Sequence, residues 1–339
     1  MSNLAPNKGV YTIGLAPKLI FSIERFLTIV DYTPSNVLSG LNNTHAYTEF
    51  NYYIDFNWFS LIEQKYYSAK QVVQSEKFEV INNLTLKKEC LFYKVIVGMT
   101  PYGGLAIWLY HKQVASLLLW THGKELVQDS LNDFYGDYAE SYKKTCSYFV
   151  DSASKSIDLY NTVGLPPRDL FDNYMKQFTY RYLPLFEHWD EDEEKWQPYT
   201  EEEQETISEF DYIEEALYDG THDKLHDGGL MQYHEAGKPK KLAVKWHIKK
   251  SEYTAYFWFE DEAIRAIFDK FYGIHPDTKT DFILHFDPMK NKYQLALYRY
   301  GLREPSIIPE EAYQLIVFKN KFEHFRSENY DQPRGAWIW

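Results

Sequence analysis

Cysteine and long apolar runs are scarce in this sequence. The 339 residues include two cysteines, Cys90 and Cys146, and neither has a second cysteine at metal-binding or redox spacing. A disulfide framework and a cysteine zinc site are therefore excluded. No segment reaches the roughly 20 apolar residues that a membrane-spanning helix needs, and Lys18, Glu24 and Arg25 interrupt the apolar stretch near the start. These absences predict a cytoplasmic protein with no membrane partner.

Recognisable catalytic motifs are also missing. The sequence holds no G-x-S-x-G elbow, no phosphate-binding P-loop and no zinc-protease helix. His222 and His226 are four residues apart, which on a helix would give half of a metal site. The glycines that follow favour a polar surface loop for this segment. We therefore expect no enzymatic activity, no metal and no cofactor.

Aromatic residues are the abundant class. They make up 18% of the chain, with 30 Tyr, 22 Phe and 9 Trp. Aromatic side chains pack well on pleated surfaces, so much β-sheet is expected. They also anchor protein interfaces. The first role, in cores and on sheet faces, is the more common one.

The C-terminal part has the clearest periodicity. Residues 242–250 alternate apolar and polar side chains, and residues 253–259 form a second strand candidate. Acidic residues 260–262 then open a helix that Gly273 can end. Two further strands are predicted after it, over residues 281–287 and 293–301.

The N-terminal part repeats this order less clearly. Strands are predicted at 50–62 and 65–73, a short helix within 75–89, and a hairpin of 91–99 with 103–111 that residues 114–120 extend. The expected fold class is α+β, with two antiparallel-sheet units, each strand-strand-helix-strand-strand. A mainly helical, acidic connecting region joins them. The expected domains are 1–123, 124–236 and 237–339.

Negative charge is concentrated in one segment. Residues 187–219 hold fifteen acids and one base, Lys195, so this segment carries −14 and the rest of the chain +1 of the total of −13. Thr200 is expected to cap a helix whose face includes Phe210, Ile213 and Leu217. A solvated acidic helix is the simplest interpretation. The alternative is a surface that attracts a basic protein and repels nucleic acid.

The predicted partner-binding residues combine this charge with aromatic anchors. They are Asp190, Glu191, Asp192, Glu193, Glu194, Trp196, Tyr199, Glu201, Glu202 and Glu203. A lysine-rich segment follows at 237–250. Lysines on an edge strand, where they block aggregation, explain it better than a nucleic-acid site, because the overall charge is negative.

The hairpin carries a family-like signature. The signature consists of V-G, P, G-G and W-L in that order along the chain. The residues that match it here are Val97, Gly98, Pro101, Gly103, Gly104, Trp108 and Leu109. With residues 178–189 and 246–271, this pattern resembles a bacterial family of domains of unknown function. The resemblance covers residues 50–318. Genes of that family often lie beside type VI secretion effectors, and some members look like immunity proteins. Many relatives are periplasmic lipoproteins, whereas this chain lacks their signal peptide and lipid-bearing cysteine.

The resemblance implies an immunity protein that binds a cognate antibacterial toxin and occludes its active site or substrate cleft. Because the lipoprotein features are absent, the expected toxin acts in the cytoplasm. A basic toxin would suit the acidic segment. The alternative is a small-ligand or carbohydrate-binding protein that uses an aromatic sheet face. An enzyme without a recognisable motif is the third hypothesis.

Overall fold

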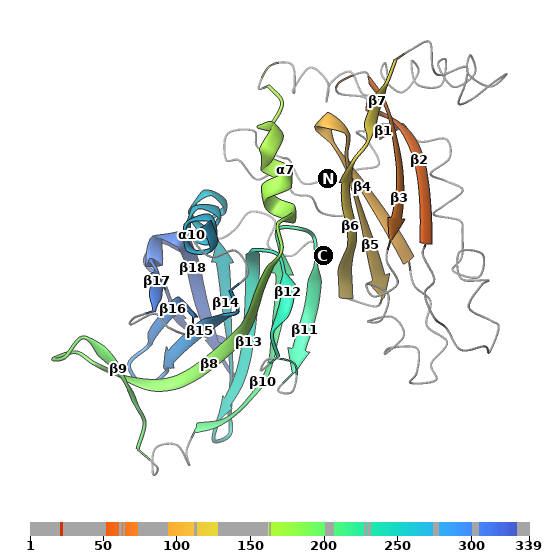
Figure 1. Cartoon of the computed structure of the whole chain (residues 1–339). Coiled ribbons are helices and arrows are strands. Elements are labelled where there is room, and N and C mark those ends of the chain that lie inside the picture. The colour runs from red at the N-terminus through yellow and green to blue at the C-terminus, as the bar shows by residue number, and fades with distance from the viewer. Residues whose placement is uncertain are drawn as a thin grey trace, which may run out of the picture. The chain divides into compact units, whose positions relative to one another are not determined.

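The computed structural model describes residues 21–22, 52–60, 63, 65–73, 94–111, 114–127, 162, 164–200, 207–226, 229, 232–273, 278–299 and 305–330. The chain divides into two compact units (Figure 1). The N-terminal unit comprises Tyr11–Asn173, and the C-terminal unit comprises Tyr174–Trp339 together with Met1–Val10.

Antiparallel strands form most of the described part of the N-terminal unit. β1 (Phe21–Ser22), β2 (Tyr52–Ser60), β3 (Lys65–Val73) and β7 (Lys124–Leu126) are paired in that order. β4 (Lys94–Thr100) pairs with β5 (Gly104–His111), and β5 pairs with β6 (Val114–His122). The predicted hairpin and its extension by a third strand are confirmed. The helix predicted within 75–89 lies outside the described residues.

Glycines shape the β4–β5 hairpin where a side chain has no room. Gly103 has a φ of 77°, a left-handed conformation that glycine adopts without strain. At Gly98, a Cβ atom would lie 2.6 Å from Cζ3 of Trp108, whose side chain is nearly buried. The signature residues therefore have a packing role in this turn.

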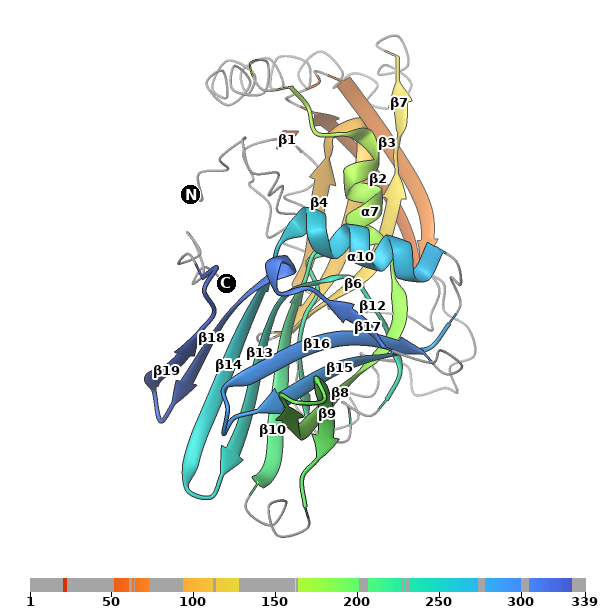
Figure 2. The ribbon, with the colours of Figure 1, turned by 90° about the vertical axis from the view of Figure 1, so that its left-hand side faces the viewer.

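Two facing sheets form the C-terminal unit (Figure 2). The large sheet has the order β19-β18-β14-β13-β10-β11 and is antiparallel. The small sheet has the order β12-β8-β15-β16-β17, in which β8 and β15 are parallel. β9 pairs with β8. The strands are β8 (Phe178–Asp190), β9 (Lys195–Pro198), β10 (Ile207–Leu217), β11 (His222–His226), β12 (His234–Ala236), β13 (Pro239–Ile248), β14 (Ser251–Phe259), β15 (Thr280–Asp287), β16 (Lys292–Arg299), β17 (Ser306–Ile308), β18 (Tyr313–Lys319) and β19 (Phe322–Arg326).

An aromatic core fills the space between these sheets. Trp246 of the large sheet is fully buried, and its ring centroid lies 5.0 Å from that of Phe286 and 6.2 Å from that of Phe186. The rings are tilted relative to one another, a geometry that suits their quadrupoles. Side chains alternate between the two faces of a strand. The neighbours of Phe186 and Phe286 along β8 and β15 therefore point away from this core.

Helix α10 (Asp261–Gly273) covers one end of the core (Figure 2). Ile264 and Phe268 are fully buried, and the ring of Phe268 lies 5.3 Å from that of Phe178. Asp261 in the first turn suits the positive end of the helix dipole. The helix and four strands predicted between residues 242 and 301 are confirmed as elements.

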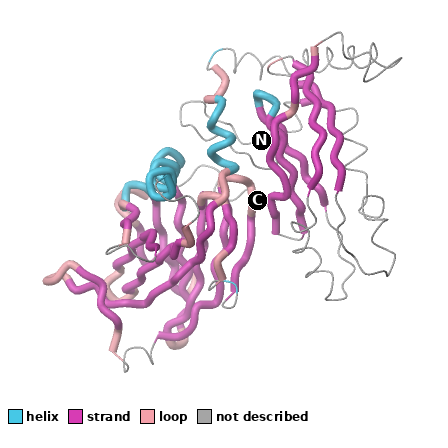
Figure 3. The backbone as a smooth tube through the Cα atoms, in the orientation of Figure 1, coloured by secondary structure: helices cyan, strands magenta, loops and turns pink. Residues whose placement is uncertain are grey.

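The predicted α+β fold class is wrong, because strands dominate the described residues (Figure 3). The α-helices that the structure describes are α10 and α7 (Arg168–Met175). The connecting region predicted to be mainly helical contains β7–β12, although residues 128–161 and 201–206 are outside the described parts. Each predicted unit was also expected to form one sheet. Instead, β13–β14 belong to the large sheet and β15–β16 to the small sheet.

A buried glutamate explains why β10 was taken for a helix. Ile213, Glu215 and Leu217 are all buried, so β10 has the two-residue period of a strand. Because a glutamate is normally exposed, the sequence shows apolar spacings of three and four residues instead. In β8, buried Phe178, Tyr180 and Tyr182 alternate with partly exposed residues in the same way.

Candidate functional site

The predicted acidic residues lie mainly in the turn of the β8–β9 hairpin. Glu187–Asp190 pair with Lys195–Pro198, and Glu191–Glu194 connect them. Asp190 Oδ1 accepts hydrogen bonds from the backbone N–H groups of Asp192 (3.0 Å) and Glu193 (3.1 Å). The bond from Glu193, supported by that from Asp192, lowers the pKa of Asp190. The turn is thus closed by one of its own carboxylates, as aspartates commonly do.

The remaining acids of the turn face solvent. Glu191 is 75% exposed, and its carboxylate lies 3.8 Å from Lys290 Nζ. Glu193 is ion-paired with Lys195, and both side chains are more than half exposed. Five acids, Asp190–Glu194, face two lysines, so the turn keeps a net negative charge. Exposed ion pairs of this kind add little stability, but the unbalanced charge acts on a partner at a distance.

Tryptophans form the base of the acidic hairpin. Trp189 and Trp196 face each other across the two strands, with ring centroids 5.2 Å apart. Trp196 also stacks on His285 of β15 at 4.9 Å, and its Nε1 donates to Gln294 Oε1 of β16 (2.7 Å). Its side chain is partly exposed. The hairpin is therefore packed on the small sheet.

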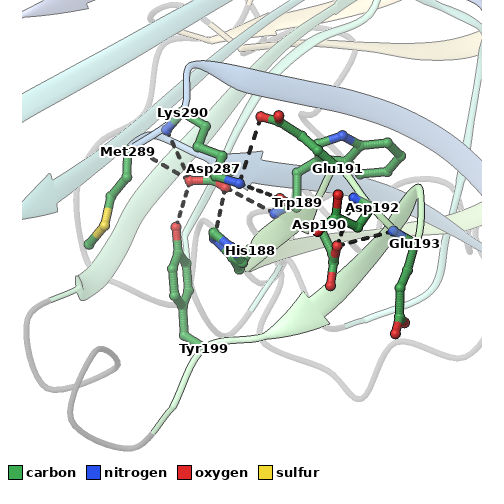
Figure 4. Close-up of polar contacts among 10 residues, drawn as sticks. All are labelled: His188, Trp189, Asp190, Glu191, Asp192, Glu193, Tyr199, Asp287, Met289 and Lys290. Carbon is green, nitrogen blue, oxygen red and sulfur yellow. Dashed lines mark hydrogen bonds and ion pairs between the residues drawn. The ribbon is translucent and has the colours of Figure 1, made fainter.

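Asp287, at the end of β15, ties the hairpin to the sheet (Figure 4). Its fully buried carboxylate accepts hydrogen bonds from the Tyr199 hydroxyl (2.9 Å) and the Trp189 backbone N–H (2.9 Å). The backbone N–H groups of Met289 and Lys290 donate to it at 3.2 Å each. His188 Nδ1 lies 3.3 Å from the same carboxylate. One side chain thus organises both strands of the hairpin and the β15–β16 turn.

The predicted partner-binding residues have different environments. Glu191, Asp192, Glu193 and Glu194 are exposed, and Trp196 is partly exposed. Tyr199 is 3% exposed and supports the hairpin from inside. Glu201, Glu202 and Glu203 lie outside the described residues. Sequence reasoning missed Asp287, because a carboxylate before a Pro-containing turn looks like an ordinary turn residue.

A second site that the sequence did not reveal is the buried carboxyl of Glu215. Tyr182 donates its hydroxyl to Glu215 Oε2 at 2.6 Å, and His234 Nε2 lies 3.9 Å from Oε1. Burial raises the pKa of Glu215 to about 8, and burial lowers the pKa of His234. Glu215 and His234 are therefore both neutral near pH 7. With Glu215 only 2% exposed, a substrate cannot reach this carboxyl.

The outer face of the large sheet carries aromatic side chains. Tyr256 and Trp258 on β14 are stacked at 5.7 Å, and Phe318 on β18 meets Tyr256 edge-on at 6.0 Å. Lys241 Nζ lies 5.2 Å from the Tyr256 ring. On the same face, Lys224 Nζ lies 3.5 Å from the Tyr212 ring. We call the Tyr256, Trp258 and Phe318 side chains on this face, with Lys241 beside them, the aromatic platform.

The histidine pair considered as half a metal site belongs to a strand. His222 and His226 are the two ends of β11, whereas a surface loop was expected. His222 lies 3.2 Å from Glu214 across the strand pair. In the parts of the chain that the structure describes, no group of three or more His, Cys, Asp or Glu side chains has the arrangement of a metal site. Likewise, no helix among them is long and apolar enough to cross a membrane.

Comparison with known proteins gives no relative: no family model, no curated protein and no solved structure matches this chain. The resemblance drawn from the hairpin signature stays a prediction.

Proposed function

We propose that the chain is an immunity protein that binds a basic antibacterial toxin, with the acidic β8–β9 turn as part of its contact surface. The observation that carries the proposal is a net-negative, exposed turn on a rigid support. A turn whose backbone is already held in place loses little backbone conformational entropy on binding. Acidic charge also speeds the encounter with a basic partner. The signature resemblance points to the same class, as does the absence of recognisable catalytic motifs.

Binding is expected to block the toxin without turnover. Asp190–Glu194 supply carboxylates that can pair with the lysines and arginines of a basic substrate cleft. Trp196, which is partly exposed beside them, provides an aromatic contact. The neighbouring segment 201–203 adds three further acids in the sequence.

The test is co-expression with the product of the neighbouring gene, followed by affinity purification and a growth assay. We expect a stable complex and rescue of cells from that product's toxicity. Glu191→Lys combined with Asp192→Lys should weaken the complex at least about tenfold. A matched control, Glu262→Lys with Glu311→Lys, reverses two exposed acids elsewhere in the same unit. The role of the acidic turn would be refuted if both double variants lost the same amount of affinity, or if the parent formed no complex.

The aromatic platform supports the second candidate, a small-ligand or carbohydrate-binding function. Stacked Tyr256 and Trp258 offer flat ring faces of the kind that sugars bind, with Lys241 as a polar neighbour. Thermal denaturation in the presence of a saccharide panel tests this candidate. We expect a raised midpoint that Trp258→Ala abolishes and that the acidic-turn variants leave unchanged. Absence of any shift would leave the platform a packing surface.

A further inference from the structure

Two turns of the large sheet lie side by side and form a lysine-rich tip. Lys249 and Lys250 connect β13 to β14, and Asn320 and Lys321 connect β18 to β19. The Asn320 N–H donates to the Glu252 carbonyl oxygen (2.8 Å), and the Glu252 N–H donates to Asn320 Oδ1 (2.9 Å). These reciprocal bonds hold the two turns together. We call Lys249, Lys250, Asn320, Lys321 and Phe322 the basic tip.

Phe322 is the apolar apex of the basic tip. Its side chain is 78% exposed, the highest value among the exposed large apolar side chains of the described residues. It is the first residue of β19 and directly follows Lys321, which has a φ of 71° in a tight turn. Moving an exposed phenylalanine side chain out of water is favourable. Its position thus favours insertion into an apolar medium.

Two acids near the basic tip are already paired with bases. Glu252 is paired with Lys245 (2.7 Å) and Glu323 with Arg326. Lys249, Lys250 and Lys321 have no ion-pair partner among the described residues. The basic tip therefore presents three lysine side chains outside ion pairs within that part of the chain. Charges beyond about 8 Å are largely screened at physiological salt.

We propose that the basic tip docks on the surface of an anionic lipid bilayer. Phe322 enters the boundary between headgroups and acyl chains, while Lys249, Lys250 and Lys321 contact the anionic headgroups. Such surface binding combines the burial of apolar side chains with the electrostatic attraction between lysines and anionic headgroups. A protein partner fits less well, because a stable protein interface needs roughly 20–30 residues from each side. This proposal departs from the sequence-based expectation of no membrane partner.

Co-sedimentation of the full chain with lipid vesicles tests the proposal. The parent should bind vesicles of phosphatidylcholine with phosphatidylglycerol and not vesicles of phosphatidylcholine alone. Phe322→Ser should reduce binding at least about fivefold, and Lys249→Glu with Lys321→Glu at least about tenfold. Two matched controls should bind as the parent does. Ile307→Ser changes a 57% exposed apolar residue on β17, and Lys270→Glu changes an exposed lysine on α10.

Insertion has its own readout in Phe322→Trp. Brominated lipids should quench the fluorescence of this variant more than that of the parent, and thermal midpoints should show that all variants remain folded. The proposal is overturned if the parent ignores anionic vesicles or if the controls lose as much binding as the tip variants. It is also overturned if Phe322→Ser binds normally while duplex DNA displaces the vesicles, since the lysines then recognise polyanions in general.

Discussion

Two carboxyl groups in the C-terminal unit are buried to a similar extent but differ in their partners. The Asp287 carboxylate receives three backbone N–H groups and the Tyr199 hydroxyl. Glu215 receives one tyrosine hydroxyl, and its pKa is raised to about 8 by burial. A buried charge is tolerated when several donors compensate for lost water. Glu215 lacks that compensation and keeps its proton.

Glu215→Gln should therefore change how stability depends on pH. The pKa of Glu215 rises from 4.5 to about 8 on folding, so the folded state holds the proton more tightly. The protonated Glu215 contributes to the free energy of unfolding, fully below pH 4.5, and this contribution is lost as the pH rises towards 8. The glutamine amide does not ionise. Between pH 4.5 and 8 the free energy of unfolding should therefore fall less in the variant than in the parent, by up to roughly 5 kcal/mol.

Urea unfolding of parent and variant at several pH values between 5 and 8 measures this difference. Glu235→Gln, an exposed acid on β12, is the control and should follow the parent. Identical slopes for the parent and Glu215→Gln would show that Glu215 does not titrate in this range.

Gly98→Ala should destabilise the N-terminal unit by about 1–3 kcal/mol. The added methyl group would meet the Trp108 ring at 2.6 Å, so the ring or the strand must shift. Thermal denaturation measures the loss. Combining the change with Trp108→Leu should recover part of it relative to Trp108→Leu alone, because the smaller side chain leaves room. If the stability losses of the two substitutions simply add in the double variant, the contact between residue 98 and the Trp108 ring is not the cause of the destabilisation.

At the scale of elements, local patterns account for what was predicted correctly. The sequences of β13, β14 and α10 each predict their own structure, because the apolar–polar alternation of a strand or the apolar spacing of a helix is complete within one segment. β8 and β10 were predicted as helical because polar groups occupy some of their inward positions, Tyr180 and Tyr182 in β8 and Glu215 in β10, and hide the two-residue period. The hydrogen bond between Tyr182 and Glu215 makes that burial possible. It joins two strands and is invisible in either alone.

The acidic residues of the β8–β9 hairpin were identified from the sequence, whereas the hairpin itself was not predicted. Its charges were evident from composition, whereas its support depends on residues far away in the sequence. Asp287 follows Trp189 by 98 residues, and Gln294 follows Trp196 by 98 residues. No spacing rule within one segment links them. The turn residues could thus be named from the sequence, but not the anchor that orients them.

Asp287→Ala should release the β8–β9 hairpin. Removing the carboxylate leaves buried donors without an acceptor, at an expected cost of about 3 kcal/mol. Tyr199→Phe removes one of these donors and should cost about 1 kcal/mol. Hydrogen exchange of the Trp189 amide should accelerate in Asp287→Ala, while β18 amides should change only with global stability. Asp192→Ala, at an exposed site in the same turn, serves as the control. Unchanged exchange at Trp189 would contradict the anchoring role.

On the scale of the whole molecule, charge is unevenly distributed. One segment carries −14 and the rest of the sequence +1. For the proposed toxin complex, the association rate should fall at least about tenfold between low and high salt, because screening removes long-range attraction. Stopped-flow mixing measures this rate. Replacing Glu191, Asp192 and Glu193 by their amides should flatten the salt dependence, and a parent rate independent of salt would argue against electrostatic steering.

The parallel pairing of β8 with β15 has a consequence for biosynthesis. Tyr180 of β8 lies opposite Thr280 of β15, a partner made 100 residues later. At roughly 5–20 residues per second, a ribosome needs on the order of 5–20 s to deliver that partner. During this interval the newly made β8, with its alternating aromatic side chains, has an open edge that can pair wrongly. Nascent chains of this protein should therefore depend on chaperones most strongly while that stretch is being translated.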